Sequence, residues 1–319
     1  MRSNKNKNSC SGWFCVIRFK VSYVNQPIPS SLPGNNNRVL TAIFNPLLLS
    51  FPVTKVQFSK FKLQGIVNLS VLSIFGRLKD KFIYALQRLL GFEKYLYIFS
   101  NFKIRTLKND RKEGDFFTFL DMVNPGDCVL DIGANIGIMT YFLSEKVGVG
   151  EVFAFEPVPE NLTALKKIIS KHKLKNVTVV DKALGAQAGE LEMVMPNFGK
   201  ARKQGLSHVI HDSIDTFNEG TKYKVDVVTL DSVFENSTCK PTAIKLDVEN
   251  FEYFVLKGGE KLITQNHPII YTELWDNENR SKCMNILTSW GYKTFVVVNG
   301  ELVKWDKDVH SHQNFIFLA

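Results

Sequence analysis

The chain has 319 residues, 45% of them hydrophobic, which is enough to bury a full core in one large or two modest domains. Residues 1–114 hold 19 basic and 4 acidic residues (net +15), whereas residues 115–319 hold 21 and 27 (net −6). The mildly acidic part argues against nucleic acid as a partner, since phosphate binding needs a positive cleft. The basic part suits peripheral contact with an anionic membrane surface, and a solvated extension is the alternative.

The cysteines and the hydropathy pattern indicate a compartment. Five cysteines are scattered along the chain without a disulfide framework or a zinc-ligand spacing, which favours a reducing environment. No apolar run approaches the roughly 18 residues that span a bilayer, and no secretory signal pattern opens the chain. We therefore expect a cytoplasmic protein that is at most peripheral at the membrane.

The N-terminal third divides into two predicted regions. Residues 1–65 are rich in Asn, Pro and Ser and predict an irregular basic extension. Residues 66–113 predict a helical cap region, in which residues 80–90 form an amphipathic helix that Gly91 ends. Residues 95–107 are interpreted as a short strand pair. The catalytic domain is predicted over residues 114–319, beginning with an amphipathic helix at 115–123.

A strand, a glycine turn and a helix follow each other over residues 128–147. Val129, Leu130 and Ile132 form a short apolar strand, and apolar residues recur at helical spacing after the turn. Gly133 and Gly137 mark the turn, but the close glycine pair of a dinucleotide fingerprint is missing. Asp131 at the strand end would repel a pyrophosphate and suits an ammonium or sulfonium group. The turn therefore favours S-adenosylmethionine over NAD.

The next two strands complete the predicted cofactor site. Residues 151–155 form a strand, and Glu156 at its tip is expected to accept hydrogen bonds from both ribose hydroxyls. Residues 177–180 form a third strand, after which Asp181 is a candidate acceptor for the adenine amine and Ala183 a small packing surface. The residues predicted to bind the cofactor are Asp131, Gly133, Ala134, Asn135, Gly137, Glu156, Asp181 and Ala183.

Six ordered motifs resemble those of the FkbM family of S-adenosylmethionine-dependent methyltransferases. They lie at residues 131–137, 155–161, 228–232, 244–249, 255–258 and 268–273. The resemblance implies an α/β class I methyltransferase (Rossmann-like) fold: a seven-stranded, mostly parallel sheet with helices on both faces, here with an N-terminal helical extension. It also implies O-methylation of a saccharide, a glycolipid or another small hydroxylated acceptor. The chain has Asn250 where the family usually has glycine, and Asn tolerates the left-handed backbone that such a turn requires.

Carboxylates cluster where two further strands end. Residues 243–246 lead to Asp247, and residues 269–272 lead to Glu273, so both should lie at the ligand edge of the sheet. Asp247 and Glu273 are candidates for positioning the acceptor and for the general base. Glu249 is a catalytic candidate or a helix-start residue, and Glu252 is interpreted as a helix-start residue. A divalent cation held by Asp247 and Glu273 is an alternative that the spacing does not require.

Extra elements are expected between the third and fourth strands of the sheet. Residues 191–195, 207–210 and 225–230 predict strands or loops beyond a minimal sheet, and we place acceptor contacts there. His208 is a candidate base in this segment, with a loop histidine as the alternative. The end of the chain predicts a helix at 279–290, a hairpin turning at Asn299-Gly300, and a closing strand at 314–318.

Two other classes of function remain open at this point. A nicotinamide-dependent oxidoreductase uses a similar sheet but needs the missing glycine pair and an acid on the hydride side. A non-catalytic protein that keeps the fold for binding is the other alternative, and the retention of Asp247 and Glu273 argues against it.

Overall fold

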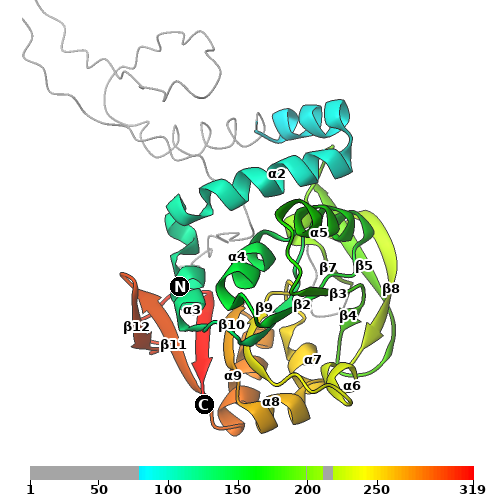
Figure 1. The fold of residues 1–319 in the computed structure, drawn as a ribbon. Helices are drawn as coiled ribbons and strands as arrows, with labels where there is room; N and C mark the ends of the chain where they lie inside the picture. The colour runs from blue at the N-terminus through cyan, green and yellow to red at the C-terminus, as the bar shows by residue number, and fades with distance from the viewer. Residues whose placement is uncertain (1–78, 199, 211–217) are drawn as a thin grey trace, which may run out of the picture. The chain divides into compact units, whose positions relative to one another are not determined.

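The computed structural model describes residues 79–198, 200–210 and 218–319 (Figure 1). The chain divides into two units, Met1–Lys79 and Asp80–Ala319, and the second contains both sheets. The predicted irregular region, residues 1–65, lies outside the described residues, as does the beginning of the predicted cap region.

The main sheet has eight strands and is parallel over five of them. Its order is β12-β11-β13-β10-β9-β1-β2-β3, and β13, β11 and β12 run antiparallel to their neighbours. The strands are β1 Cys128–Ile132, β2 Glu151–Phe155, β3 Val177–Val180, β9 Pro241–Leu246, β10 Ile269–Glu273, β11 Lys293–Val298, β12 Glu301–Lys304 and β13 Asn314–Leu318. The sequence predicted seven strands, and β12 is the eighth because the predicted hairpin at Asn299-Gly300 adds a strand at the edge.

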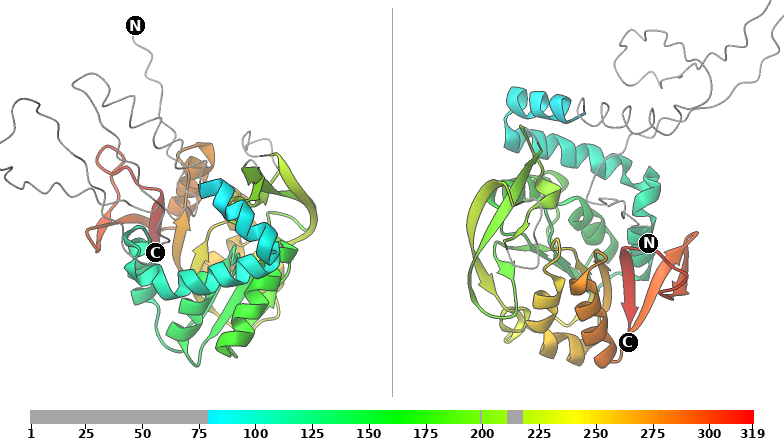
Figure 2. Two further views of the ribbon diagram at one scale, coloured as in Figure 1. Left: turned by 90° about the horizontal axis from the view of Figure 1, so that it is seen from above. Right: turned by 180° about the vertical axis from the view of Figure 1, so that it is seen from behind.

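Helices cover both faces of the main sheet, as predicted (Figures 1 and 2). One layer contains α3 Gly114–Met122, α4 Ile138–Val147 and α5 Pro159–His172, and the other contains α7 Glu252–Lys257, α8 Glu260–Asn266 and α9 Glu278–Ser289. Helix α2, Phe92–Thr106, packs across α4 and α5, and an unlabelled helix over residues 79–90 precedes it. The predicted α/β class I architecture is confirmed.

A second sheet is inserted between β3 and β9. Its order is β4-β8-β5-β6, and β7 pairs with β5. The strands are β4 Ala183–Leu184, β5 Gly189–Phe198, β6 Ala201–Arg202, β7 His208–Val209 and β8 Gly220–Val228, with the short helices η3 Gln204–Leu206 and α6 Leu230–Phe234. The sequence predicted extra strands here, and the structure shows that they form a sheet of their own.

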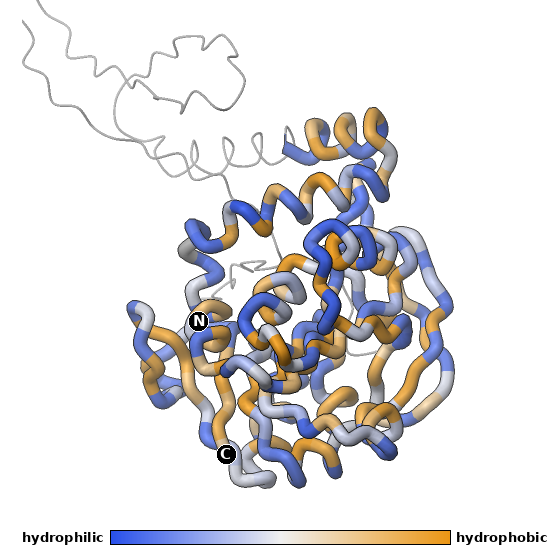
Figure 3. Tube along the Cα trace, in the orientation of Figure 1, coloured by the Kyte–Doolittle hydropathy of each residue, from blue (hydrophilic) through white to orange (hydrophobic). Residues whose placement is uncertain are grey.

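One hydrophobic core extends through both sheets. Leu130 of β1 and Ile244 of β9 belong to the same buried cluster as Met193 and Val227 of the second sheet. The central strands are buried on both faces, so they consist of nearly continuous apolar residues rather than alternating ones. Figure 3 shows these apolar strands at the centre of the unit. The second sheet is therefore firmly packed on the first.

The strand pair predicted for residues 95–107 is wrong, because α2 covers almost all of this segment. Its buried residues Leu96, Ser100 and Ile104 recur at every fourth position, which is the spacing of one helix face. Two short helices, η1 Leu107–Asn109 and η2 Arg111–Glu113, then lead into α3. Tyr95, Tyr97 and Phe99 occur at every second position, which resembles the alternation of a strand in the sequence.

The cysteine prediction also needs correction. Cys128 at the start of β1 forms a disulfide with Cys239, their Cα atoms 6.4 Å apart. The two are 111 positions apart in sequence, and they meet because β9 lies beside β1, with Cys128 opposite Pro241. In the described part of the chain, no helix has both the length and the apolar character needed to cross a membrane.

Candidate functional site

The carboxyl ends of β1, β9 and β10 bring the glycine turn and two carboxylates side by side. Ile132 pairs with Leu246, and Leu246 pairs with Thr272. The next residues along the three strands are Gly133, Asp247 and Glu273, so they lie at neighbouring positions; Gly133 and Asp247 follow their strands, and Glu273 is the last residue of β10. The sequence predicted that Asp247 and Glu273 share this edge, and the strand register places them there.

The turn after β1 uses its own N–H groups internally. The N–H groups of Gly133 and Ala134 both donate to the carbonyl oxygen of Phe155, at 3.1 and 2.9 Å. The N–H of Asn135 donates to Glu156 Oε2 at 2.8 Å, so carboxylate and carbonyl oxygens consume three donors. A pyrophosphate site needs such donors free at a helix N-terminus. The turn is therefore suited to a ligand that brings donors or positive charge of its own.

Gly133 holds the turn against the end of β9. Its φ is +80°, and a Cβ atom added there would collide with the backbone carbonyl of Asp247. Any side chain at this position would separate the turn from β9. The glycine is thus required both by the left-handed backbone and by the close approach of the two strand ends.

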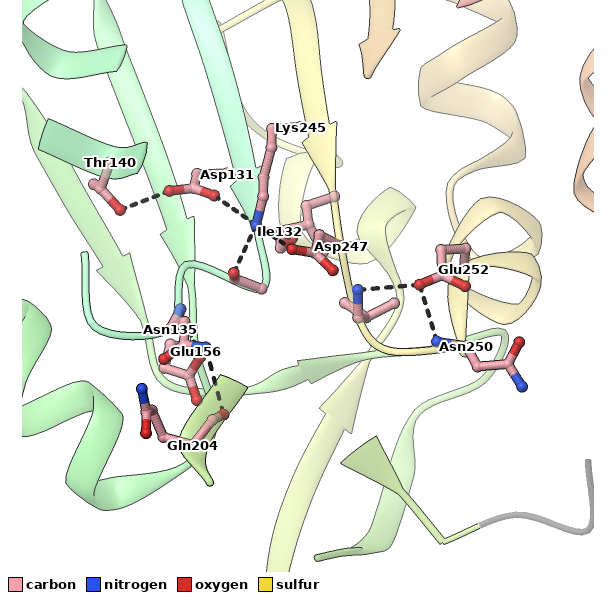
Figure 4. Close-up of polar contacts among 12 residues, drawn as sticks. Asp131, Ile132, Asn135, Thr140, Glu156, Gln204, Lys245, Asp247, Asn250 and Glu252 are labelled. Carbon is pink, nitrogen blue, oxygen red and sulfur yellow. Dashed lines mark hydrogen bonds and ion pairs between the residues drawn. The ribbon is translucent and has the colours of Figure 1, made fainter. Parts of the chain in front are cut away.

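A buried lysine connects the turn with the acidic edge (Figure 4). Lys245, on β9, is 2% exposed, and its Nζ donates to the Gly133 carbonyl at 2.7 Å. The same Nζ lies 3.4 Å from Asp131 Oδ1 and 3.6 Å from Asp247 Oδ2. Burial opposes the charge of Lys245, but the two carboxylates outweigh burial and raise its pKa. The sequence prediction missed this residue, although a single lysine in an apolar strand is itself a signal.

Asp131 lies beneath the turn rather than on its surface. Its side chain is fully buried, and Oδ2 accepts a hydrogen bond from Thr140 Oγ1 at 2.6 Å. Oδ1 faces Lys245. The negative charge of Asp131 is therefore already compensated by the protein, and its predicted role as a direct partner of an ammonium or sulfonium group stays a prediction.

Glu156 is held at the tip of β2 with unused acceptors around it. It is 4% exposed, and Oε1 accepts from the N–H of Val158 at 2.8 Å and from Asn161 Nδ2 at 3.4 Å. Burial raises the pKa of Glu156 to about 7, against these hydrogen bonds. The buried Oδ1 atoms of Asn135 and Asn161 have no hydrogen-bond partner. Hydroxyl groups of a bound ribose would supply the missing donors, so these residues fit an adenosine-type ligand.

Glu249 and a residue of the cap segment enlarge the acidic cluster. Burial, followed by the charges of Asp247 and Glu273, raises the pKa of Glu249 well above its usual range. Burial also raises the pKa of Glu113, at the end of η2, to about 7, against the nearby Lys103 and together with Asp247. Nothing in the sequence pattern indicates that Glu113 faces this edge, because it is brought there by the path of α2 and η2.

Glu252 shapes the loop after β9. Its Oε1 accepts the N–H groups of Val248 and Asn250, each at 3.1 Å, and Oε2 accepts from Asn279 Nδ2 at 2.7 Å. It is also the first residue of α7, which confirms the helix-start interpretation. Asn250 has a φ of +78°, so the turn survives the replacement of glycine as predicted.

The remaining predicted positions lie around the edge of this arrangement. Asp181 follows β3 with an exposed side chain, and Ala183 is buried in β4 opposite Val227. Their roles toward an adenine stay predictions. His208 is 2% exposed, and its ring nitrogens lie 2.9 Å from the Leu206 carbonyl and 3.0 Å from Asn218 Oδ1. That histidine holds the inserted sheet together, which corrects its candidacy as a base.

The described carboxylates and histidines do not form a metal centre. Within residues 79–198, 200–210 and 218–319, no group of three or more His, Cys, Asp or Glu side chains is arranged to hold a metal ion. The divalent cation that the sequence left open as an alternative therefore gains no support from the described carboxylates.

Comparison with known proteins gives a consistent result. A family model described as "Methyltransferase FkbM domain" matches residues 131–294. The 31-O-demethyl-FK506 methyltransferase FkbM of Streptomyces tacrolimicus is 31% identical over 161 residues, which are 43% of this chain and 61% of that protein. The chain thus matches less than two thirds of the length of this relative.

Solved structures with a similar chain trace include two methyltransferases. Methyltransferase FkbM from Methylobacillus flagellatus KT is 18% identical with a TM-score of 0.43, and the match covers 62% of this chain and 44% of that one. An S-adenosylmethionine-dependent O-methyltransferase from Thermotoga maritima is 16% identical with a TM-score of 0.37, covering 67% and 69%.

Proposed function

The chain belongs to the FkbM family of methyltransferases, and from this premise we propose that it methylates a hydroxyl group of a saccharide, a glycolipid or another small hydroxylated acceptor. The methyl donor is S-adenosylmethionine. The observation that carries the proposal is the register of β9 and β10, which sets Asp247 and Glu273 beside the glycine turn. Carboxylates at that position could orient the hydroxyl group of an acceptor and accept its proton.

The donor side of the site is built from acceptor atoms. When bound, S-adenosylmethionine supplies a methyl group activated by a positive sulfonium. Glu156, Asn135 and Asn161 would hold the ribose: the Oδ1 atoms of both asparagines lack donors, and the Glu156 carboxylate accepts from two backbone N–H groups and from Asn161 Nδ2. Lys245 contacts both the Gly133 carbonyl and the Asp247 carboxylate, so it would fix their relative positions beneath this ligand.

Three carboxyl groups, those of Asp247, Glu249 and Glu273, would face the methyl acceptor. Burial, followed by the charges of Asp247 and Glu273, raises the pKa of Glu249 well above its usual range, which favours its protonated form more than in an ordinary glutamate. Asp247 or Glu273 is then the group that orients the acceptor hydroxyl and takes its proton. Holding two reactants in line supplies about 7–11 kcal/mol in favourable cases, and a positioned base adds about 10²–10⁴-fold.

Glu156→Gln is expected to weaken S-adenosylmethionine binding by about 1–3 kcal/mol, because a neutral amide replaces a charged acceptor for the ribose hydroxyls. Titration calorimetry at pH 8, above the pKa of Glu156, measures the change. Glu151→Gln, at the exposed opposite end of β2, is the matched control and should bind normally. Equal affinities for the two variants and the wild type would remove Glu156 from the ribose site.

The acceptor class is tested by transfer of a labelled methyl group. The purified protein and labelled S-adenosylmethionine are added to separate saccharide, glycolipid, protein and RNA fractions, and the labelled product is identified. Label in the saccharide or glycolipid fraction supports the proposal, whereas label only in protein or RNA overturns it. Donor binding without turnover on any fraction favours the non-catalytic alternative, and binding of NADH in place of the donor favours the oxidoreductase.

A further inference from the structure

Four large apolar side chains are exposed on the two N-terminal helices of the described unit. Leu89 is 81% exposed, Phe102 54%, Phe82 52% and Ile98 44%. Only Gly91 separates the helix over residues 79–90 from α2, so the two helices are adjacent at that turn (Figures 1 and 2). Single exposed apolar residues are ordinary, but a group on adjacent helices indicates an interaction surface.

Basic residues alternate with these apolar side chains. On α2, Lys94, Ile98, Phe102 and Arg105 are exposed at spacings of four, four and three, so they form one stripe along the helix. The preceding helix exposes Lys81 and Arg88 in the same way. In the described part of the chain, none of these four bases forms an ion pair. The stripe therefore carries net positive charge.

A basic groove between α2 and α5 adjoins the stripe. It has a volume of about 700 Å³ and is lined by Tyr97, Thr163, Lys166, Lys167, Ser170 and Lys171. Lys171 lies 5.6 Å from the centre of the Tyr97 ring, and Lys167 is 3.5 Å from Glu93 Oε2. Glu93 is the one acid of α2, so the groove remains positive. Its amines and hydroxyls are suited to a phosphate group.

We propose that these helices and the groove form a docking face for an anionic lipid bilayer. The docking face comprises Lys81, Phe82, Arg88, Leu89, Lys94, Ile98, Phe102 and Arg105, with Lys166 and Lys171 in the groove. Helices that bind in the membrane interface combine lysine and arginine with phenylalanine and leucine in this manner. The bases complement acidic headgroups, and the apolar side chains enter the boundary of the acyl chains.

Other occupants fit the docking face less well. Leu89 and Ile98 neither donate to phosphates nor stack on bases, so they contribute little to a nucleic-acid interface. A second copy of the face would bring like charges together, which opposes association. The inference rests on this surface alone and is independent of the proposed acceptor.

Vesicle flotation of the full-length protein tests the docking face. We expect binding to phosphatidylcholine vesicles that contain about 30% phosphatidylserine, little binding to pure phosphatidylcholine, and weaker binding as salt is raised. Lys94→Glu combined with Arg105→Glu is expected to reduce binding by about 30-fold or more. The matched control reverses Lys240 and Lys261 at the other end of the unit, near α6 and α8, and should bind like the wild type (Figure 1).

A second variant tests the apolar part of the face. Ile98→Ser combined with Phe102→Ser is expected to reduce binding by about ten-fold and to make the remaining binding fully sensitive to salt. These exposed positions should leave the thermal unfolding midpoint unchanged, which separates lost docking from lost folding. Three results would overturn the proposal. The first is equal binding to neutral and acidic vesicles, and the second is a control variant that loses as much binding as the Lys94→Glu/Arg105→Glu variant. The third is binding of RNA in place of vesicles.

Discussion

Replacing Lys245 by methionine is expected to lower the free energy of unfolding by about 3–5 kcal/mol, because it leaves buried negative charge without a partner. Asp131 is fully buried, and its Oδ1 faces only this lysine. Methionine is similar in length to lysine, so the loss of stability is due to the missing charge rather than to a missing volume. Urea unfolding at pH 7 measures the change, and donor affinity should fall because the Gly133 carbonyl loses its hydrogen bond.

The double variant Asp131→Asn/Lys245→Met distinguishes a charge effect from a packing effect. The introduced amide removes the uncompensated charge and still accepts a hydrogen bond from Thr140, so the double variant should be more stable than Lys245→Met alone. Lys293→Met, at an exposed position on β11, controls for the general effect of losing a lysine. If the single and double variants are equally unstable, Asp131 is not the partner that makes Lys245 necessary.

Asp247→Asn and Glu273→Gln are expected to lower methyl transfer by about 10²–10⁴-fold for whichever carboxylate is the base, while S-adenosylmethionine affinity stays within a few-fold of the wild type. The separation follows from the strand order, because β9 and β10 lie on the opposite side of β1 from β2, which is followed by Glu156. The rate of methyl transfer is measured at a saturating concentration of S-adenosylmethionine, with the acceptor that the labelling experiment has identified. Calorimetry on the same samples measures donor binding.

Asp276→Asn is the matched control for these two variants. Asp276 follows the same strand end as Glu273, but its side chain is 92% exposed and pairs with Arg280 at the surface. It should keep full activity. Full activity of both Asp247→Asn and Glu273→Gln would place the base elsewhere, and Glu113, with its raised pKa, is then the next carboxylate to replace.

The sequence predicted those parts of the site that are encoded by contiguous residues. The strand before Gly133, the turn, α4 and the strand before Glu156 follow one another within about one βαβ unit, where apolar periodicity and glycine spacing determine the structure. Asp247 and Glu273 were predicted to share an edge because parallel strands of such a sheet end on the same side. The register of β9 and β10 confirms that inference.

What the sequence did not predict depends on contacts between distant segments. Residues 95–99 alternate aromatic and aliphatic side chains, as a strand can, and the packing of this segment against α4 and α5 shows that it forms a helix. Glu113 reaches the acidic cluster through the path of the chain after α2. Cys128 and Cys239 meet because of strand order. No local pattern contains any of these three facts.

The inserted sheet has a structural consequence for how relatives of this protein diverge. Its first and last strands meet at their base, where Leu184 pairs with Val228 and the Gly185 N–H donates to the Val228 carbonyl at 3.1 Å. Because its two ends are hydrogen-bonded to each other, the segment can change in length at its outer turns while the residues packed on the main sheet keep their positions. Our prediction that acceptor contacts lie in this inserted sheet has a direct test: chimeras joined at the β4–β8 pairing should take their acceptor preference from the parent that supplies the insert and their affinity for the methyl donor from the other parent.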